Sequence, residues 1–265
     1  MLLARIRCGS TCQFIATGLL LIALSFFVAS LIIHFKPISL DTSENSYFSQ
    51  TRVWAHQGGS AKEFLPNSPE AVAAAFRSGF DGVELDIYFD RELDTIILSH
   101  DKPYVKQNGA LVTLNEISPP SNGWFWLDLK NLSELKSKDI RRFAELLSQL
   151  GFAERTLVES TAMRQLIYLD IQGVQTIYWM SAGPTRTPLY YIVVKALLWV
   201  FGIDAVSIST PSHHYIQPHF MPSSIFSFTE NSGERLCHLT NKRAIAVILT
   251  DLPKRQFASQ CQIDQ

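Results

Sequence analysis

The chain has 265 residues, a formal net charge of −1 and a hydrophobic content of 47%. This near-neutral charge leaves no basic surplus to neutralise a phosphate backbone, so the composition argues against a nucleic-acid-binding protein. Length and apolar content are sufficient for one large globular domain and a separate apolar segment.

The N-terminal region differs from the rest of the chain. Residues 14–33 form a run of twenty residues without a charge, and a helix of that length measures about 30 Å, enough to cross the hydrocarbon core of a bilayer. Arg5 and Arg7 precede the run and no acid does. We therefore expect a cytoplasmic N-terminus at residues 1–13, a single-pass transmembrane anchor at 14–33, and the remainder on the non-cytoplasmic side. The alternative is a cleaved signal peptide, cut after a small residue such as Ser30, but the length of the run favours retention.

A polar linker is predicted for residues 34–50, followed by one folded domain over residues 51–265. In that domain, apolar strand-like runs alternate with helical patterns, as in a mostly parallel α/β fold. Its size is usual for an eight-stranded α/β barrel, yet nine strand candidates are present. The surplus lies between Val83 and His100, where residues 90–94 are too few for a crossover helix. We expect a hairpin or an irregular rim strand there.

One helical pattern, over residues 189–203, is unusually apolar, with Lys195 as its only charge. Outer helices of a soluble barrel normally have a polar face, and this segment has almost none. It carries Tyr190, Tyr191 and Trp199, residue types that are enriched at membrane interfaces. We expect this helix to lie on a bilayer. A second transmembrane span is disfavoured, because the run is short and Lys195 lies in its middle.

Four cysteines fall into two groups. Cys8 and Cys12 precede the predicted anchor and are candidates for palmitoylation or for free thiols. Cys237 and Cys261 lie in the part predicted to be exported, where a disulfide is chemically permitted, although their spacing does not prove one.

Five residues with acid–base or metal-binding side chains each follow a short apolar run, where a strand would bring them to a common rim. They are His56, Glu84, Asp86, His100 and Asp128. Glu84 and Asp86 are two residues apart, so both point to the same face of a strand. Such neighbouring carboxylates repel each other unless a cation lies between them, and hard oxygen ligands suit Mg²⁺ or Ca²⁺. Asp128 would be the third ligand, from another strand.

Lys130 follows Asp128 by two residues and would share its face. It can hold a phosphate oxygen or form a salt bridge to Asp128 or Glu84, and the sequence does not decide between these roles. Glu159 and Glu230 also lie at strand ends, and the pattern assigns them no role.

Several motifs occur in the order that is typical of one enzyme family. The segments are RVWAHQGG, LPNSPEAVAAAFRSGFDGVELDIYFD and TIILSHD, followed by FWLDLK, LVES, IFSFTEN and LTDLP. Their order over most of residues 53–253 resembles the glycerophosphodiester phosphodiesterases, within the phosphatidylinositol-phospholipase-C-like superfamily. The resemblance implies a TIM-type (β/α)8 barrel, here somewhat irregular, and metal-dependent hydrolysis of a phosphodiester such as a glycerophosphodiester or a lysophospholipid-type lipid.

The resemblance also implies roles for individual residues. His56 and His100 would be the general acid/base pair. Glu84, Asp86 and Asp128 would bind a divalent cation, Mg²⁺ or Ca²⁺. Lys130 and Gln57 would contact the substrate. In this family, a substrate hydroxyl next to the phosphate can attack first and give a cyclic phosphate, which water then opens.

Three departures from the family pattern bear on activity. Gln57 stands where the family has an arginine, the segment around Asn67 lacks its glutamate, and Asp128 is shorter than the usual glutamate. These departures leave two alternatives open. One is a catalytically impaired barrel that binds a phospholipid or a partner protein. The other is a lyase-type transphosphorylase whose end product is a cyclic phosphate.

Overall fold

The computed structural model describes residues 17–18, 47–59, 63–220, 225–240 and 245–261. Eight parallel strands form a closed barrel, because β11 pairs with β1 and β1 in turn pairs with β2. The strands, in barrel order, are β1 (Arg52–Ala55), β2 (Gly82–Asp90), β6 (Trp124–Leu129), β7 (Thr156–Ser160), β8 (Gln175–Trp179), β9 (Ala205–Ser209), β10 (Ile225–Phe228) and β11 (Val247–Thr250). The predicted α/β barrel is therefore confirmed.

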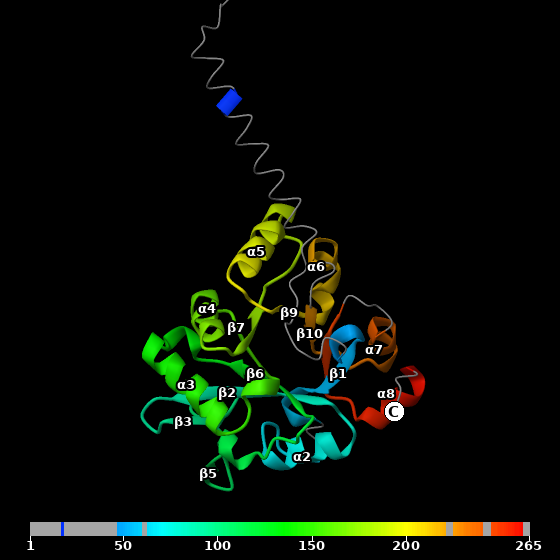
Figure 1. Ribbon diagram of the computed structural model, residues 1–265. Helices are drawn as coiled ribbons and strands as arrows, with labels where there is room; N and C mark the ends of the chain where they lie inside the picture. Colours follow the sequence, from blue (N-terminus) through cyan, green and yellow to red (C-terminus); the bar gives the residue numbers. More distant parts are fainter. Residues whose placement is uncertain (1–16, 19–46, 60–62, 221–224, 241–244, 262–265) are drawn as a thin grey trace, which may run out of the picture.

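Helices surround this barrel as an outer layer (Figure 1). They are α2 (Pro69–Arg77), α3 (Ser137–Gln149), α4 (Met163–Ile171), α5 (Pro188–Val200), α6 (His213–Phe220), α7 (Gly233–Thr240) and α8 (Lys254–Cys261). Local chemistry sets the start of α2: Pro69 occupies its first position, and the Ser68 hydroxyl accepts a hydrogen bond from the amide of Ala71. Apolar residues between strands and helices form the larger core.

The connection from β2 to β6 accounts for the irregularity. Strand β3 (Thr95–Leu98) pairs antiparallel with β2 outside the barrel, and a small hairpin of β4 (Lys106–Gln107) and β5 (Ala110–Leu111) follows it. The short 3₁₀ helix η3 (Leu114–Glu116) completes the connection. The predicted hairpin is thus confirmed, and among the described residues this crossover contains no α-helix.

Aromatic side chains fill the end of the barrel where the strands begin. Tyr47 and Phe48, in the 3₁₀ helix η1 (Tyr47–Ser49), pack against the inner core, and the Tyr47 ring stacks on Trp124 with centroids 5.2 Å apart. Trp54 lies so close to Gly82 that a Cβ there would be 2.4 Å from the indole ring. Among the described residues, contacts with the barrel therefore extend back to Tyr47, inside the segment predicted as a linker.

The predicted anchor at 14–33 lies outside the described residues except for Thr17 and Gly18, and Cys8 and Cys12 also lie outside them. None of the described helices has both the length and the apolar character needed to cross a bilayer. A disulfide links Cys237 to Cys261 and so joins α7 to α8.

Candidate active site

Three carboxylates meet inside the barrel where the strands end. Asp86 on β2 is paired in register with Asp128 on β6, and Glu84 lies two residues before Asp86 on the same face of β2. Glu84 and Asp86 are buried, and Asp128 is partly buried. One oxygen from each carboxylate lies within 4.8 Å of the other two. The barrel thus brings together the three acids predicted as metal ligands.

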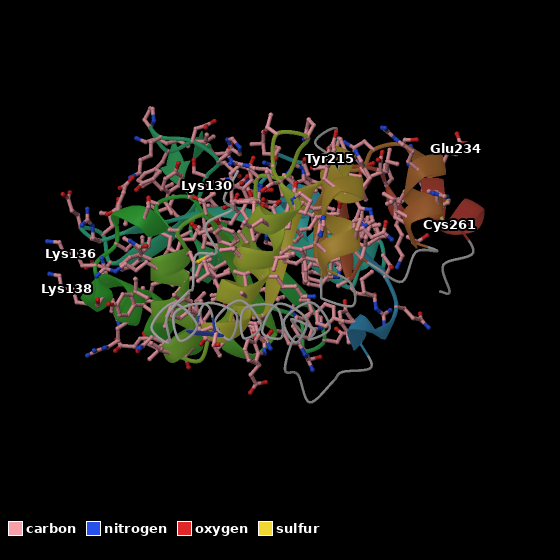
Figure 2. All side chains as sticks on the ribbon, turned by 90° about the horizontal axis from the view of Figure 1, so that it is seen from above. Lys130, Lys136, Lys138, Tyr215, Glu234 and Cys261 are labelled. Atoms are coloured by element: carbon pink, nitrogen blue, oxygen red, sulfur yellow. A yellow bond between two sulfur atoms is a disulfide. The ribbon has the colours of Figure 1, made fainter. Side chains whose placement is uncertain are left out.

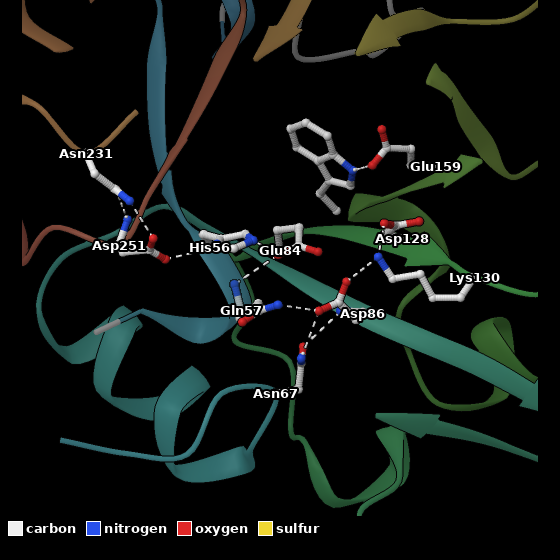
Figure 3. A network of polar contacts seen from close by, with 11 residues as sticks. His56, Gln57, Asn67, Glu84, Asp86, Asp128, Lys130, Glu159, Asn231 and Asp251 are labelled. Atoms are coloured by element: carbon white, nitrogen blue, oxygen red, sulfur yellow. Dashed lines mark hydrogen bonds and ion pairs between the residues drawn. The ribbon is translucent and has the colours of Figure 1, made fainter. Parts of the chain in front are cut away.

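Lys130 is the cation that the structure places among these acids. Its Nζ lies 2.6 Å from Asp86 Oδ1 and also pairs with Asp128 Oδ2 (Figure 3). The two carboxylates outweigh burial and raise the pKa of Lys130, so the side chain is an ammonium ion at neutral pH. Of the two roles predicted for Lys130, the structure shows the salt bridge, to Asp86 and Asp128.

Two amide side chains complete the shell around Asp86. Gln57 Nε2 and Asn67 Nδ2 both donate to Asp86 Oδ2, over 2.6 and 3.0 Å. The backbone N–H of Gln57 donates to Glu84 Oε2 over 2.9 Å. Gln57 and Asn67 both have positive φ, at 51° and 56°, a conformation that is uncommon outside glycine and recurs at functional sites. This backbone geometry directs their donors at the acids.

His56 is held by a carboxylate that the sequence did not suggest. Its Nδ1 lies 2.7 Å from Asp251 Oδ1, and Asn231 Nδ2 donates to the other oxygen of Asp251 over 2.6 Å (Figure 3). Burial raises the pKa of Asp251, but the bonds from His56 and Asn231 outweigh it, so its pKa is lowered overall. An ionised Asp251 accepts a hydrogen bond from Nδ1–H of His56, and Nε2 then faces Glu84, 3.8 Å from Oε2.

His100 reaches the same cavity from the antiparallel arm. It follows β3, which is not a barrel strand, and its Nδ1 lies 3.0 Å from Asp101 Oδ1. Its side chain is 56% exposed, against 27% for His56. The two imidazoles therefore differ in setting: His56 is anchored within the barrel mouth, and His100 stands at the rim.

The electrostatic balance of the site is negative. Burial is the largest cause that raises the pKa of Glu84 well above its ordinary value, and the charges of Asp86 and Asp128 raise it further. Burial also raises the pKa of Asp128, against the lowering effect of Lys130. One ammonium ion thus leaves part of the carboxylate charge uncompensated.

A fourth acid lies next to these three. Glu159 on β7 is paired in register with Asp128, and its carboxylate accepts hydrogen bonds from Trp126 Nε1, over 2.7 Å, and from the Ser207 hydroxyl. Burial raises the pKa of Glu159 well above its ordinary value, and the charge of Asp128 adds to this effect. Glu230, the other acid left unassigned, bonds instead to the Ser232 amide and Arg235.

All seven predicted site residues line one cavity of about 430 Å³, and Glu159 lines it as well. The seven are His56, Gln57, Glu84, Asp86, His100, Asp128 and Lys130. Part of the wall is apolar: Trp179 and Phe228 line it with ring centroids 6.4 Å apart. The cavity thus has charged residues on one part of its wall and aromatic residues on another, an arrangement that suits a substrate with a polar and an apolar part.

The donor set fits a divalent cation. Glu84, Asp86 and Asp128 carry three negative charges against the single positive charge of Lys130, which leaves a charge of −2 when all four groups are ionised. Carboxylate oxygens are the ligands that Mg²⁺ and Ca²⁺ prefer. The residues that would hold the ion are therefore these three acids.

Comparison with solved structures identifies the fold. A phosphodiesterase from Oleispira antarctica, solved with the product sn-glycerol-3-phosphate, matches with a TM-score of 0.62 over 81% of this chain and 99% of its own, at 18% identity. A glycerophosphodiester phosphodiesterase from Parabacteroides distasonis matches with a TM-score of 0.61 over the same shares, also at 18% identity. The chain has the fold of the glycerophosphodiester phosphodiesterases. No protein-family model matches the sequence, and no curated protein matches it.

Most of the residues that line this cavity could be predicted from the sequence, because in the glycerophosphodiester phosphodiesterase fold the ends of the barrel strands meet at one site. Ordered motifs at strand ends identified seven of the lining residues. Asp251, Asn67 and Glu159 were given no role in it. Asp251 lies within the LTDLP motif and follows β11, whose pairing with β1 brings it beside His56, so this neighbourhood depends on barrel closure. The register of Glu159 with Asp128 likewise becomes visible only once β6 and β7 are paired.

Cation binding can be measured without substrate. Calorimetric titration with Mg²⁺ and Ca²⁺ should show binding to the wild-type protein that weakens at least about tenfold in Asp128→Asn, because a charged ligand is lost. Lys130→Met should bind the cation about tenfold more tightly, since its ammonium ion no longer competes for Asp86 and Asp128. Glu234→Gln, at an exposed acid on α7, serves as the control. Absence of binding in both wild type and Lys130→Met would show that the acids do not form a cation site.

Stability should depend on pH through Glu159. Its pKa is raised in the folded state, so ionisation disfavours folding at high pH, and this penalty disappears as pH falls towards the ordinary value of 4.5. Glu159→Gln can keep bonds to Trp126 and Ser207 without the charge. We expect a higher melting temperature than wild type at pH 8 and a difference that shrinks towards pH 4.5. A wild type as stable as the variant at pH 8 would contradict the assignment.

Proposed function

We propose that this protein hydrolyses phosphodiesters in a cation-dependent reaction, with a glycerophosphodiester or a lysophospholipid-type lipid as substrate. The observation that carries the proposal is the convergence of two imidazoles, three carboxylates and one ammonium group on one cavity. Transfer of a phosphoryl group between oxygens needs proton exchange at two oxygens and positive charge at the phosphate. This constellation offers both.

A structural neighbour supports the substrate class. The Oleispira antarctica phosphodiesterase was solved with sn-glycerol-3-phosphate as product, a monoester that hydrolysis of a glycerophosphodiester releases. A lysophospholipid contains the same phosphodiester bond, and its glycerol also carries an acyl chain. The aromatic wall of Trp179 and Phe228 provides a surface on which such an apolar group can pack.

His56 is the candidate general base. Because Nδ1–H donates a hydrogen bond to Asp251, the lone pair on Nε2 faces the cavity and can take a proton from the attacking hydroxyl or water. Asp251 does not touch the substrate in this scheme. It is a positioning residue that fixes the tautomer and the orientation of His56, as Asn231 in turn fixes Asp251.

His100 is the candidate general acid. It lines the same cavity from a different element, so a proton can enter at one oxygen of the phosphate while another leaves at the second. Its greater exposure allows exchange of protons with solvent between turnovers. The negative charge on the leaving oxygen is thereby neutralised as the bond to phosphorus breaks.

Positive charge at the phosphate comes from Lys130 and from the cation. Bound Mg²⁺ or Ca²⁺ would supply electrostatic stabilisation of charge on the phosphoryl oxygens, held by Glu84, Asp86 and Asp128. Lys130 lines the cavity beside Asp86 and Asp128, and its Nζ can pair with a phosphoryl oxygen. Gln57, which replaces an arginine of the family pattern, donates to Asp86, so its contribution is to hold a ligand rather than to supply charge.

For cellular placement, we propose a single-pass membrane protein with the barrel on the non-cytoplasmic side. The position of Arg5 and Arg7 before the apolar run at 14–33 supports this orientation. The Cys237–Cys261 disulfide supports it as well, because disulfides persist in oxidising compartments. Protease added to the non-cytoplasmic side of sealed vesicles should digest the barrel, and protection of the barrel would contradict the orientation.

Turnover assays test the reaction. Wild-type protein should cleave glycerophosphocholine, lysophosphatidylcholine or a chromogenic diester with Mg²⁺ or Ca²⁺, and activity should be lost in EDTA. His56→Ala and His100→Ala should each lower kcat by a factor of roughly 10² to 10⁴, the usual contribution of a positioned acid or base. Asp251→Asn should also lower kcat strongly, because an amide no longer fixes the tautomer that leaves the lone pair on Nε2 of His56. Activity that survives either histidine change would refute the roles assigned.

Matched controls separate this mechanism from its alternatives. His214→Ala changes an exposed histidine that does not line the cavity and should keep full activity. A phospholipid that binds in calorimetry without a cation and without turnover would instead identify a binding protein. Phosphorus NMR that shows a cyclic phosphate as the end product would identify a transphosphorylase.

A further inference from the structure

The outer surface of α5 is apolar along its whole length. Four exposed residues are spaced by four, four and three positions, so they share one face of the helix: Leu189, Val193, Leu197 and Val200. Phe201, also exposed, follows at the end of the helix and gives five residues in all. Leu189 is 67% exposed and Val200 62%. Every exposed residue from Leu189 to Phe201 is hydrophobic. We call these five residues the α5 stripe.

The single charge of this helix does not interrupt the stripe. Lys195 is 1% exposed and lies on the opposite face with Tyr191, Val194 and Leu198, which pack against the barrel. Other outer elements present charge to solvent, such as Lys136 and Lys138 around the start of α3 and Glu234 on α7 (Figure 2). A contiguous apolar face of this kind is typical of a surface that binds a membrane or a partner protein.

We propose that the α5 stripe docks on a lipid bilayer. Two features on the same chain favour a bilayer over a protein. Thirteen residues, 34–46, separate the apolar run at 14–33 from Tyr47, so a membrane that holds this run lies within about 45 Å of the barrel. Arg186, just before α5, lies 4.8 Å over the Tyr190 ring, and this pairing of a cation and an aromatic ring suits the headgroup layer.

The place of α5 in the barrel connects this surface to the cavity. Trp179 ends β8, lines the cavity and is 40% exposed, and the chain then runs through residues 180–187 into α5. Leu189 in the first turn therefore lies at the rim, and Val200 lies at the end where the strands begin. Docking places the cavity opening beside the headgroup layer. The benefit for a lipid substrate rests on the proposed function, whereas docking itself does not.

A fluorescent label tests docking on the full-length chain. In a Cys8→Ser, Cys12→Ser background, Val200→Cys is labelled with an environment-sensitive dye and reconstituted in phosphatidylcholine vesicles. Arg77→Cys is the matched control: it is exposed on α2, which follows the first barrel strand and lies across the barrel from α5 (Figure 1). Emission at position 200 should rise several-fold on reconstitution and be quenched by brominated phosphatidylcholine, with neither effect at position 77.

Two outcomes overturn the proposal. Emission at position 200 that behaves like that at position 77 shows that the stripe does not meet lipid. Emission that rises with protein density and resists brominated lipid shows that a second copy of the chain covers the stripe instead.

A second measurement links docking to the substrate. Val193→Glu with Val200→Glu should lower turnover of lysophosphatidylcholine in vesicles several-fold and leave turnover of soluble glycerophosphocholine unchanged. Equal turnover of the vesicle substrate by variant and wild type overturns the link. Absence of turnover of both substrates by wild type rejects the proposed function, while the fluorescence result still decides docking.

Discussion

Unbalanced negative charge in the mouth of the barrel is the constraint on which this site depends. Glu84, Asp86 and Asp128 share the space with one ammonium ion, and Glu159 adds a fourth acid beside them. Burial makes each ionised carboxylate costly unless positive charge or hydrogen-bond donors compensate it. The hydrogen bonds that Gln57 and Asn67 donate compensate the charge of Asp86. For Glu84 and Glu159, the same cost of burial is the largest cause of a raised pKa.

The departures from the family pattern change which charges surround these acids. Gln57 takes the position of an arginine and supplies two neutral donors, one to Glu84 and one to Asp86. Asn67 satisfies Asp86 in both directions, since it also accepts from the Asp86 amide over 2.9 Å. Neutral donors therefore bind both acids. Replacement of the arginine removes a positive charge, and the missing glutamate removes a negative one. The three acids still exceed the single charge of Lys130, so the site keeps its need for a cation, and Gln57 alone does not indicate a catalytically impaired barrel.

Local pattern was sufficient to predict the parts of the fold and the site that depend on strand periodicity. The spacing of Glu84 and Asp86 fixes their common face, and the short segment at residues 90–94 identified the hairpin. Pairing between distant strands was not readable in that way. The partner of His56, Asp251, lies 195 residues away in the sequence. Tyr47 joins the barrel by stacking on Trp124 and by accepting a hydrogen bond from Trp54 Nε1. Both depend on how the barrel closes.

The two faces of α5 show why periodicity alone could not describe this helix. A conventional amphipathic helix places its charges outward, whereas here the one charge, Lys195, points inward and the outward face is apolar. Such a surface favours aggregation in water, because exposed aliphatic side chains gain free energy when they leave it. On a bilayer, as proposed for this stripe, lipid would remove these side chains from water, and the aromatic-walled cavity would open beside the headgroups.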